Sequence, residues 1–273
     1  MTVSIAKRKS WPNRHSEAMS SLRLPDFIIA GAPRSGTTWL YSVADRHPEI
    51  RMAKPIAPEP KFFLRDDLFA RGLDYYARTW FSDIPPGALA GEKSANYLES
   101  PRAAQRIHDS LPSVRLVFVL RNPIHRAFSN YLWSRQNGLE SESFSAALAR
   151  EEEREQSIPE KLRYARPHAL YSRGLYADLL DPYLTLFPRE QLLILRYEDI
   201  VCTPAETAVR LHGFLGVAPR PQDGAGQPPA NAIRDGAGES MDPATYGSLA
   251  DRYADANRRL SDLLGPDFRV WET

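Results

Sequence analysis

The chain has 273 residues, of which 42% are hydrophobic and 25% are charged, as in an ordinary globular protein with a sizeable core. The formal net charge of +1 excludes a general attraction to nucleic acid or membranes, so any anion-binding site has to be local. The single cysteine, Cys202, excludes an internal disulfide and thiolate zinc sites, and it fits a reducing compartment.

The first 24 residues are polar and basic and lack the apolar core of a signal peptide, which predicts a flexible arm at 1–24. No run of about 18 apolar residues occurs, so the sequence gives no sign of a membrane-spanning helix. We expect residues 25–273 to form one cytoplasmic domain, without a nucleic-acid or membrane partner. The sequence does not indicate an oligomeric state.

Short apolar runs alternate with helical patterns along the rest of the chain. The apolar runs predict strands at 26–30, 88–92, 114–120 and 192–197. Helices are predicted at 37–46, 101–110, 124–136, 173–186 and 204–215, with a last one at 242–264. This alternation predicts a three-layer α/β fold, in which helices flank a central parallel sheet.

Two further stretches differ in composition from these elements. Residues 149–166 carry many charges and predict an exposed helix and loop, for which a solvated face is favoured over an acceptor-binding lid. Residues 217–239 are rich in Gly and Pro and predict a long loop, of a length that is usually functional or disordered.

The most specific feature is the segment FIIAGAPRSGTTWL at 27–40, where a buried strand runs into a glycine-containing turn and a helix. Glycines let the backbone wrap around an anion, and the N–H groups of the helix start point toward it. Thr37 and Thr38 add hydroxyl donors, and Arg34 adds a positive charge. These residues predict a phosphate-type site. An ATP-binding loop has Lys after its second Gly, where this chain has Thr37, which disfavours ATP chemistry.

A second informative segment is VRLVFVLRNPIHRAFSNYLW at 114–133. Its predicted strand ends at Arg121, and carboxyl ends of strands are where α/β sheets bind ligands. Ser129 lies about two helical turns further on. Arg121 and Ser129 can therefore converge on one anion.

Together, these two segments resemble the motifs of the sulfotransferases that use PAPS (3′-phosphoadenosine 5′-phosphosulfate). The resemblance implies a P-loop-like fold, PAPS as donor, PAP as product and no required metal. It implies that the 5′-phosphosulfate is held by Arg34, Ser35, Gly36, Thr37 and Thr38, and the 3′-phosphate by Arg121 and Ser129. Trp39 matches a position that stacks on the adenine in the cytosolic branch, and it can equally be a core residue.

Two shorter segments add catalytic candidates by the same resemblance. PEPKFFL at 58–64 resembles the carbohydrate-modifying branch, in which the Glu of Glu-x-x-Phe-Phe is the catalytic base, and this maps to Glu59. ALAGEKSANYL at 88–98 resembles a segment whose Lys lies near the transferring group, and this maps to Lys93. The choice between Glu59 and a His as the base stays open at this point.

Weaker similarities concern the second half of the chain. Tyr176 is expected either to border the nucleotide or to be a packing residue. Arg234 and Gly236 resemble a loop that closes over the 3′-phosphate.

The resemblance covers about residues 25–265. It implies sulfuryl transfer to a hydroxyl of a carbohydrate or of a glycosylated or small-molecule metabolite, with Glu59 as base. Arg34 and Lys93 are expected to stabilise charge around the transferring group. Two alternatives remain: a P-loop nucleotide kinase or NTPase, and a non-catalytic module that binds PAPS or PAP.

Overall fold

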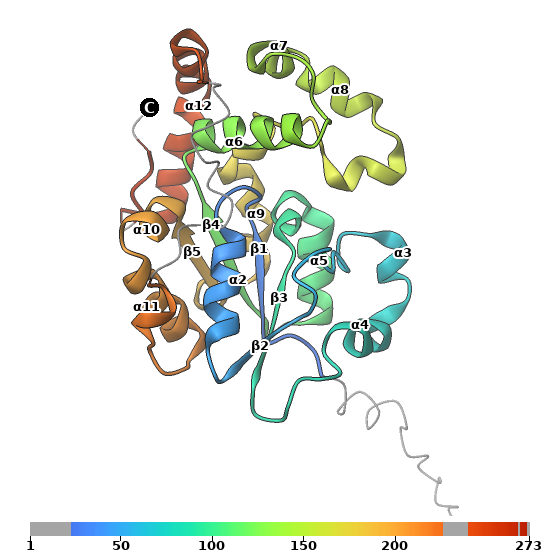
Figure 1. Cartoon of the computed structure of the whole chain (residues 1–273). Helices are drawn as coiled ribbons and strands as arrows, with labels where there is room; N and C mark the ends of the chain where they lie inside the picture. Colours follow the sequence, from blue (N-terminus) through green and yellow to red (C-terminus); the bar gives the residue numbers. More distant parts are fainter. Residues whose placement is uncertain (1–22, 226–239, 267, 272–273) are drawn as a thin grey trace, which may run out of the picture.

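The computed structural model describes residues 23–225, 240–266 and 268–271. Their centre is a sheet in the order β2-β3-β1-β4-β5, in which every neighbouring pair is parallel (Figure 1). The strands are β1 (Phe27–Gly31), β2 (Ile50–Met52), β3 (Leu89–Lys93), β4 (Arg115–Leu120) and β5 (Leu192–Arg196). Because the strands run the same way, their carboxyl ends meet at one edge of the sheet.

Helices cover both faces of this sheet (Figure 1). Successive residues of a strand point to opposite faces, and β1 and β4 are buried on both. On one face, α2 (Thr37–Arg46) and α11 (Pro204–Leu215) pack on a cluster that contains Ile29 and Val117. On the other face, α5 (Pro101–Ser110) and α9 (Tyr176–Leu186) pack on a cluster that contains Ile28 and Phe118.

A third apolar cluster joins three further helices beside the carboxyl edge of the sheet. It brings together Tyr131 of α6 (Pro123–Gln136), Phe144 of α7 (Phe144–Ala149) and Tyr253 of α12 (Pro243–Leu264).

The remaining α-helices among the described residues are α3 (Asp66–Phe69), α4 (Gly72–Trp80), α8 (Glu151–Ser157) and α10 (Tyr197–Cys202). Among the described residues, no helix combines the length and the apolar character needed to cross a bilayer.

The predicted α/β fold and its strands are confirmed: β1, β3, β4 and β5 all form where the sequence placed strands. Strand β2 was not predicted, because its three residues include an exposed Arg51 and form no apolar run. The helix expected from residue 173 begins at Tyr176, because Ser172–Gly174 form a 3₁₀ turn. Residues 1–22 of the predicted arm and residues 226–239 of the predicted loop, with Arg234 and Gly236, lie outside the described residues.

The turn between β4 and α6 is fixed by Asn122. Its Oδ1 accepts hydrogen bonds from the main-chain N–H groups of Ile124 at 3.0 Å and His125 at 3.3 Å. Pro123 occupies the first helical position, where its missing N–H is not needed. This cap holds the preceding residue, Arg121, at the carboxyl edge of the sheet.

Gly91 marks the tightest packing inside the sheet. A Cβ at this position of β3 would lie 2.4 Å from both Met52 Sδ and Phe27 Cζ, which belong to the two flanking strands. We therefore expect Gly91→Ala to lower the free energy of unfolding by about 1–3 kcal/mol, measured by urea denaturation. The control is Gly247→Ala in α12, where an added Cβ has no neighbour within 4 Å and should be neutral or stabilising. Equal destabilisation by both substitutions would contradict this account.

Candidate functional site

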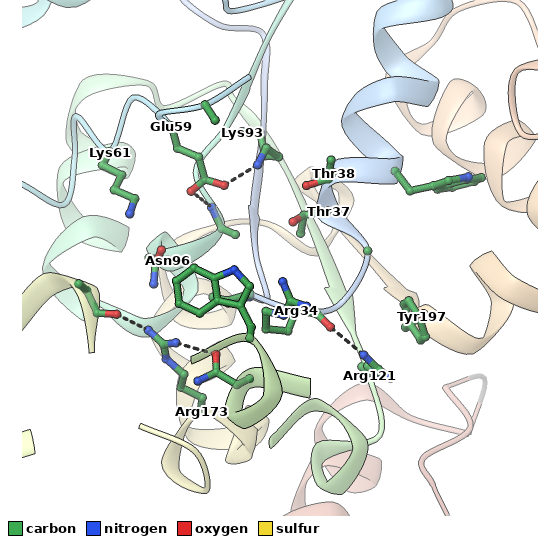
Figure 2. A pocket seen from close by; sticks show the side chains of 18 residues that line it. Arg34, Thr37, Thr38, Glu59, Lys61, Lys93, Asn96, Arg121, Arg173 and Tyr197 are labelled. Carbon is green, nitrogen blue, oxygen red and sulfur yellow. Dashed lines mark hydrogen bonds and ion pairs between the residues drawn. The ribbon is translucent and has the colours of Figure 1, made fainter. Parts of the chain in front are cut away.

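A cavity of about 430 Å³ lies at the carboxyl edge of the sheet. Part of its wall comes from segments that end or directly follow four strands: residues 33–39 after β1, residues 93–96 at β3, Arg121 after β4 and Tyr197 after β5. The cavity is rich in cations, and Figure 2 shows how they surround one space. They are Arg34, Lys61, Lys93, Arg121 and Arg173, against one lining carboxylate, Glu59. Such a site attracts anions.

The turn between β1 and α2 has a backbone geometry that suits an anion. Arg34 and Gly36 adopt left-handed backbone conformations, with φ of 65° and 91°, which helps successive N–H groups to face one side. A Cβ at Gly36 would lie 3.1 Å from the Tyr197 ring, so the loop also depends on close packing. Gly36 caps α2 without a side-chain hydrogen bond, which leaves the first N–H groups of this helix available to an anion.

Arg34 and Arg121 lie side by side at this loop. Arg121 donates a hydrogen bond from its guanidinium to the main-chain oxygen of Arg34 at 3.2 Å, and it lies 4.4 Å above the Tyr197 ring. Burial and the neighbouring Arg121 charge lower the pKa of Arg34 to about 10. Burial also lowers the pKa of Arg121. Neither guanidinium has an ion pair within the described part of the chain, so a bound anion would relieve their repulsion.

Three predicted donor-site residues lie behind the cavity wall rather than on it. Ser129 is 4% exposed, and its hydroxyl has no hydrogen-bond partner among the described residues. Ser35 is fully buried, and its hydroxyl has no hydrogen-bond partner among the described residues. Burial raises the pKa of the Tyr176 phenol. Tyr176 donates to the main-chain oxygen of Arg121 at 2.9 Å. Tyr176 therefore positions the main chain of Arg121, although Tyr176 itself does not line the cavity.

Trp39 is a core residue that also borders the cavity. Its side chain is 2% exposed and belongs to the core cluster around α2. It also contributes to the cavity wall. The residue is thus mostly core, with a small part of its surface available to a ligand.

At the other side of the cavity, Glu59 is held by the end of β3 (Figure 2). Its Oε1 lies 2.5 Å from the ammonium of Lys93, and its Oε2 accepts a hydrogen bond from the Ala95 N–H at 3.1 Å. The side chains of Lys93 and Glu59 are 7% and 17% exposed. The two predicted catalytic residues therefore form one fixed pair.

Behind this pair lies a buried chain of hydrogen bonds. Glu92 is fully buried and accepts hydrogen bonds from Tyr76 and, at 2.6 Å, from the hydroxyl of Ser94. The Ser94 oxygen accepts in turn from the Lys61 N–H at 2.9 Å. Glu92 thus supports the main chain of Lys61 through Ser94.

Several lining residues were not singled out from the sequence. Lys61 lies two residues after Glu59, and Arg173 lies three residues before Tyr176. Arg173 is 5% exposed and contacts Glu99 Oε1 at 3.0 Å, Asn130 Oδ1 at 3.2 Å and the main-chain oxygen of Ala165 at 2.7 Å. The other unpredicted polar or aromatic lining residues are Asn96, Asn130, Trp133 and Tyr197. Asn96 lies within the segment 88–98, and Asn130 and Trp133 lie within 114–133, but the sequence assigned none of them a role.

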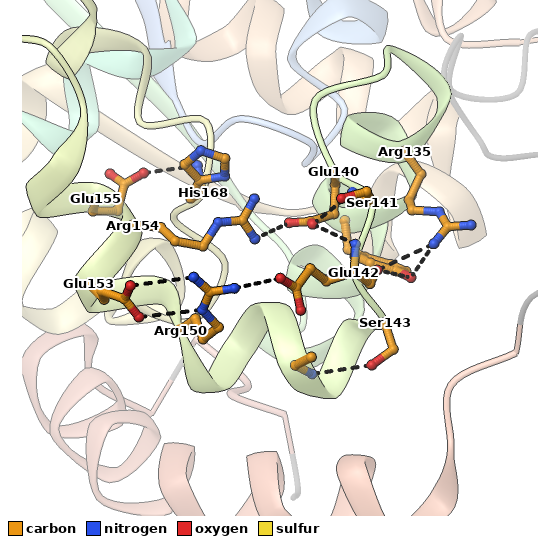
Figure 3. Close-up of polar contacts among 12 residues, drawn as sticks. Arg135, Glu140, Ser141, Glu142, Ser143, Arg150, Glu153, Arg154, Glu155 and His168 are labelled. Carbon is orange, nitrogen blue, oxygen red and sulfur yellow. Dashed lines mark hydrogen bonds and ion pairs between the residues drawn. The ribbon is translucent and has the colours of Figure 1, made fainter.

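The segment 149–166 is an exposed helix and turn for much of its length, as the solvated-face interpretation predicted, although several of its charges are paired. Figure 3 shows that its charges are paired: Arg154 contacts Glu140 Oε2 at 2.6 Å, and Arg150 contacts Glu142 Oε1 at 2.6 Å. Glu151 is buried, since its oxygens accept hydrogen bonds from the N–H groups of residues 171 and 172. The segment ends in the 3₁₀ turn Glu160–Ala165, whose last residue lines the cavity.

No group of three or more His, Cys, Asp or Glu side chains that could hold a metal ion occurs in the described ranges 23–225, 240–266 and 268–271.

Burial raises the pKa of Glu92 from an ordinary value of 4.5 to about 7. Between these values, the folded protein keeps a proton that the unfolded chain has released, so stability falls as pH rises from about 4.5 to about 7. Glu92→Gln cannot ionise and removes this loss. We expect the variant to gain stability relative to the parent as pH rises from about 5 to about 8, measured by urea denaturation. A stability difference that does not change with pH would contradict the burial of an ionisable Glu92.

Comparison with known proteins gives a consistent result. The family described as "Sulfotransferase domain" matches residues 24–225 of this chain. The sulfotransferase from Alicyclobacillus acidocaldarius has a solved structure that is 30% identical, with a TM-score of 0.72. The match covers 89% of this chain and 96% of that chain.

Curated relatives are similar over a shorter part of their length. Heparan sulfate glucosamine 3-O-sulfotransferase 6 of Homo sapiens is 31% identical over 199 residues, which is 71% of this chain and 53% of the relative. Bifunctional heparan sulfate N-deacetylase/N-sulfotransferase 3 of Homo sapiens is 31% identical over 207 residues, which is 72% of this chain and 23% of the relative. This chain therefore spans about half or less of the relatives that it matches.

Proposed function

This chain belongs to the sulfotransferase family, and on that basis we propose that it moves a sulfuryl group from PAPS to a hydroxyl group of a carbohydrate or a glycosylated small molecule. The observation that carries the proposal is one cavity that contains both an anion-binding loop and a fixed carboxylate. The loop contributes Arg34, Thr37 and Thr38, and the carboxylate is Glu59. This arrangement supplies a donor site and a candidate base in one space.

The donor residues fit a nucleotide with two separate anionic groups. Residues 34–38 would hold the 5′-phosphosulfate through main-chain N–H groups, threonine hydroxyls and the Arg34 charge. Arg121 and Ser129 would hold the 3′-phosphate. One observation supports this fit: two buried donor atoms, Arg34 Nε and Ser129 Oγ, have no partner in the described part of the chain, whereas buried donors normally have one.

In the proposed reaction, Glu59 accepts the proton of the acceptor hydroxyl. The acceptor oxygen forms a bond to sulfur while the bond between sulfur and the phosphate oxygen breaks. The products are the sulfated acceptor, PAP and a protonated Glu59, which then releases its proton to solvent. Arg34 and Lys93 stabilise the negative charge that develops on the leaving phosphate. Lys93 and the Ala95 N–H also fix the orientation of the base.

The carbohydrate part of the proposal rests on two lines of support. The names of the curated relatives describe sulfotransferases that act on heparan sulfate. The cavity also combines polar and aromatic lining residues, Asn96, Asn130 and Trp133, which suits the mixed surface of a sugar. A hydroxyl acceptor is proposed by analogy with the 3-O-sulfotransferase relative, since a carboxylate base by itself suits a hydroxyl or an amine.

The donor assignment is tested by calorimetry with PAP, 5′-AMP and ATP with magnesium. We expect PAP to bind more tightly than 5′-AMP because of its 3′-phosphate. Arg121→Ala should reduce that preference by about 10-fold or more, since it removes a charge-assisted contact. Arg258→Ala is the control, because this exposed α12 residue pairs with exposed Asp255. This variant should keep the parent's preference for PAP over 5′-AMP.

Two outcomes would overturn the proposal. Binding of ATP with magnesium in preference to PAP would indicate a nucleotide kinase or NTPase. Tight PAP binding without any turnover of PAPS across a broad panel of glycosides would indicate a non-catalytic binding module.

The base assignment is tested by Glu59→Gln, which keeps the shape of the side chain and removes its basicity. We expect kcat for PAP release from PAPS with a glycoside acceptor to fall by about 100-fold, while the Kd for PAP stays within about 3-fold. Glu153→Gln, at an exposed residue of α8, should match the parent. Near-normal turnover by Glu59→Gln would assign the base to another residue, such as a histidine.

A further inference from the structure

Lys61 differs from the other cations on its side of the cavity in its charge balance. The charge of Lys93 is matched by Glu59 at 2.5 Å, and that of Arg173 by Glu99 at 3.0 Å. Lys61 has no ion pair in the described part of the chain. One unit of positive charge therefore remains near the proposed base.

The backbone holds Lys61 in place at a conformational cost. Its φ is 51°, in the left-handed region that side chains other than Gly adopt rarely. Its N–H donates to Ser94 Oγ at 2.9 Å, which ties it to the buried Glu92. Its ammonium lies 5.4 Å from the centre of the Tyr164 ring, on the turn that closes the charged segment 149–166. Strained residues that the surroundings hold in place are concentrated at functional sites.

The surroundings of Lys61 also make its charge costly. Burial lowers the pKa of Lys61 below its ordinary range, and the neighbouring Arg173 acts in the same direction, although Glu59 opposes it. An ammonium in such a place gains from a bound anion. The anion that pairs with Lys61 is not the donor's phosphate. Figure 2 shows Lys61 on the Glu59 side of the cavity, with Arg121 and Tyr197 on the opposite side.

We propose that Lys61 binds an anionic substituent of the acceptor, a carboxylate or a sulfate, next to the hydroxyl that Glu59 deprotonates. This inference rests on the proposed function and narrows its substrate class. A neutral sugar would leave the Lys61 charge unmatched, whereas one negative charge balances it. The preferred acceptor is therefore an acidic glycoside, such as a uronic acid or an already sulfated sugar.

The experiment uses two acceptor analogues that differ in one group, 4-nitrophenyl β-D-glucuronide and 4-nitrophenyl β-D-glucoside. Their binding to the protein saturated with PAP is measured by calorimetry, so that the donor loop is filled. We expect the glucuronide to bind about 10-fold more tightly than the glucoside. Lys61→Met should reduce this ratio to about 1, and Lys61→Glu should favour the glucoside.

The matched control is Arg65→Met. Arg65 also faces the Tyr164 ring, at 5.7 Å, but it pairs with Asp67 and does not line the cavity. This variant should keep the 10-fold ratio. The Kd for PAP, measured on every variant, shows whether each one is folded and keeps the donor site.

A glucuronide that binds no better than the glucoside, or a preference that survives Lys61→Met, would overturn the inference. Failure of the parent protein to bind PAP would instead overturn the proposed function, so the two failures are distinguishable.

Discussion

Positive charge gathered at the carboxyl edge of a parallel sheet is the constraint on which the rest of the site depends. The sheet brings Arg34, Lys93 and Arg121 together from three separate parts of the chain. Desolvated cations need partners, and the protein supplies some of them: Glu59 faces Lys93, and Glu99 faces Arg173. The remaining positive charges lie in two places, at residues 34–38 with Arg121 and at Lys61. An anionic ligand gains most binding free energy at these two places.

The position of Arg34 and Thr37 at the cavity was predictable because the elements that carry them are contiguous in sequence. A strand, a glycine turn and a helix occupy residues 27–40, so local pattern alone places both side chains at the carboxyl edge of the sheet. Glu59 and Lys93 were each predicted by resemblance, but their ion pair depends on how two distant segments pack. Lys61 and Tyr197 were missed because no local pattern specifies which side chains of a loop face a cavity.

The charged segment 149–166 shows a different limit of sequence reasoning. Composition counts charges but does not show their partners, and a solvated run and a paired run look alike. Here Glu151 is buried because main-chain N–H groups twenty residues later bind it. Those partners carry no sequence signal. Strand β2 escaped prediction for a related reason, since three residues paired to β3 are too few to show a period.

Tyr197 touches both halves of the proposed donor site. Its ring lies 4.4 Å from the Arg121 guanidinium, and it leaves only 3.1 Å for a Cβ at Gly36. This rigid ring therefore helps to hold Arg121 and the turn at residues 34–38 at one spacing, together with the hydrogen bond from Arg121 to the Arg34 main-chain oxygen. If these groups bind the two ends of one nucleotide, as proposed, this spacing favours donors whose charged groups lie equally far apart. A change of donor preference would then involve residue 197 as well as the two loops.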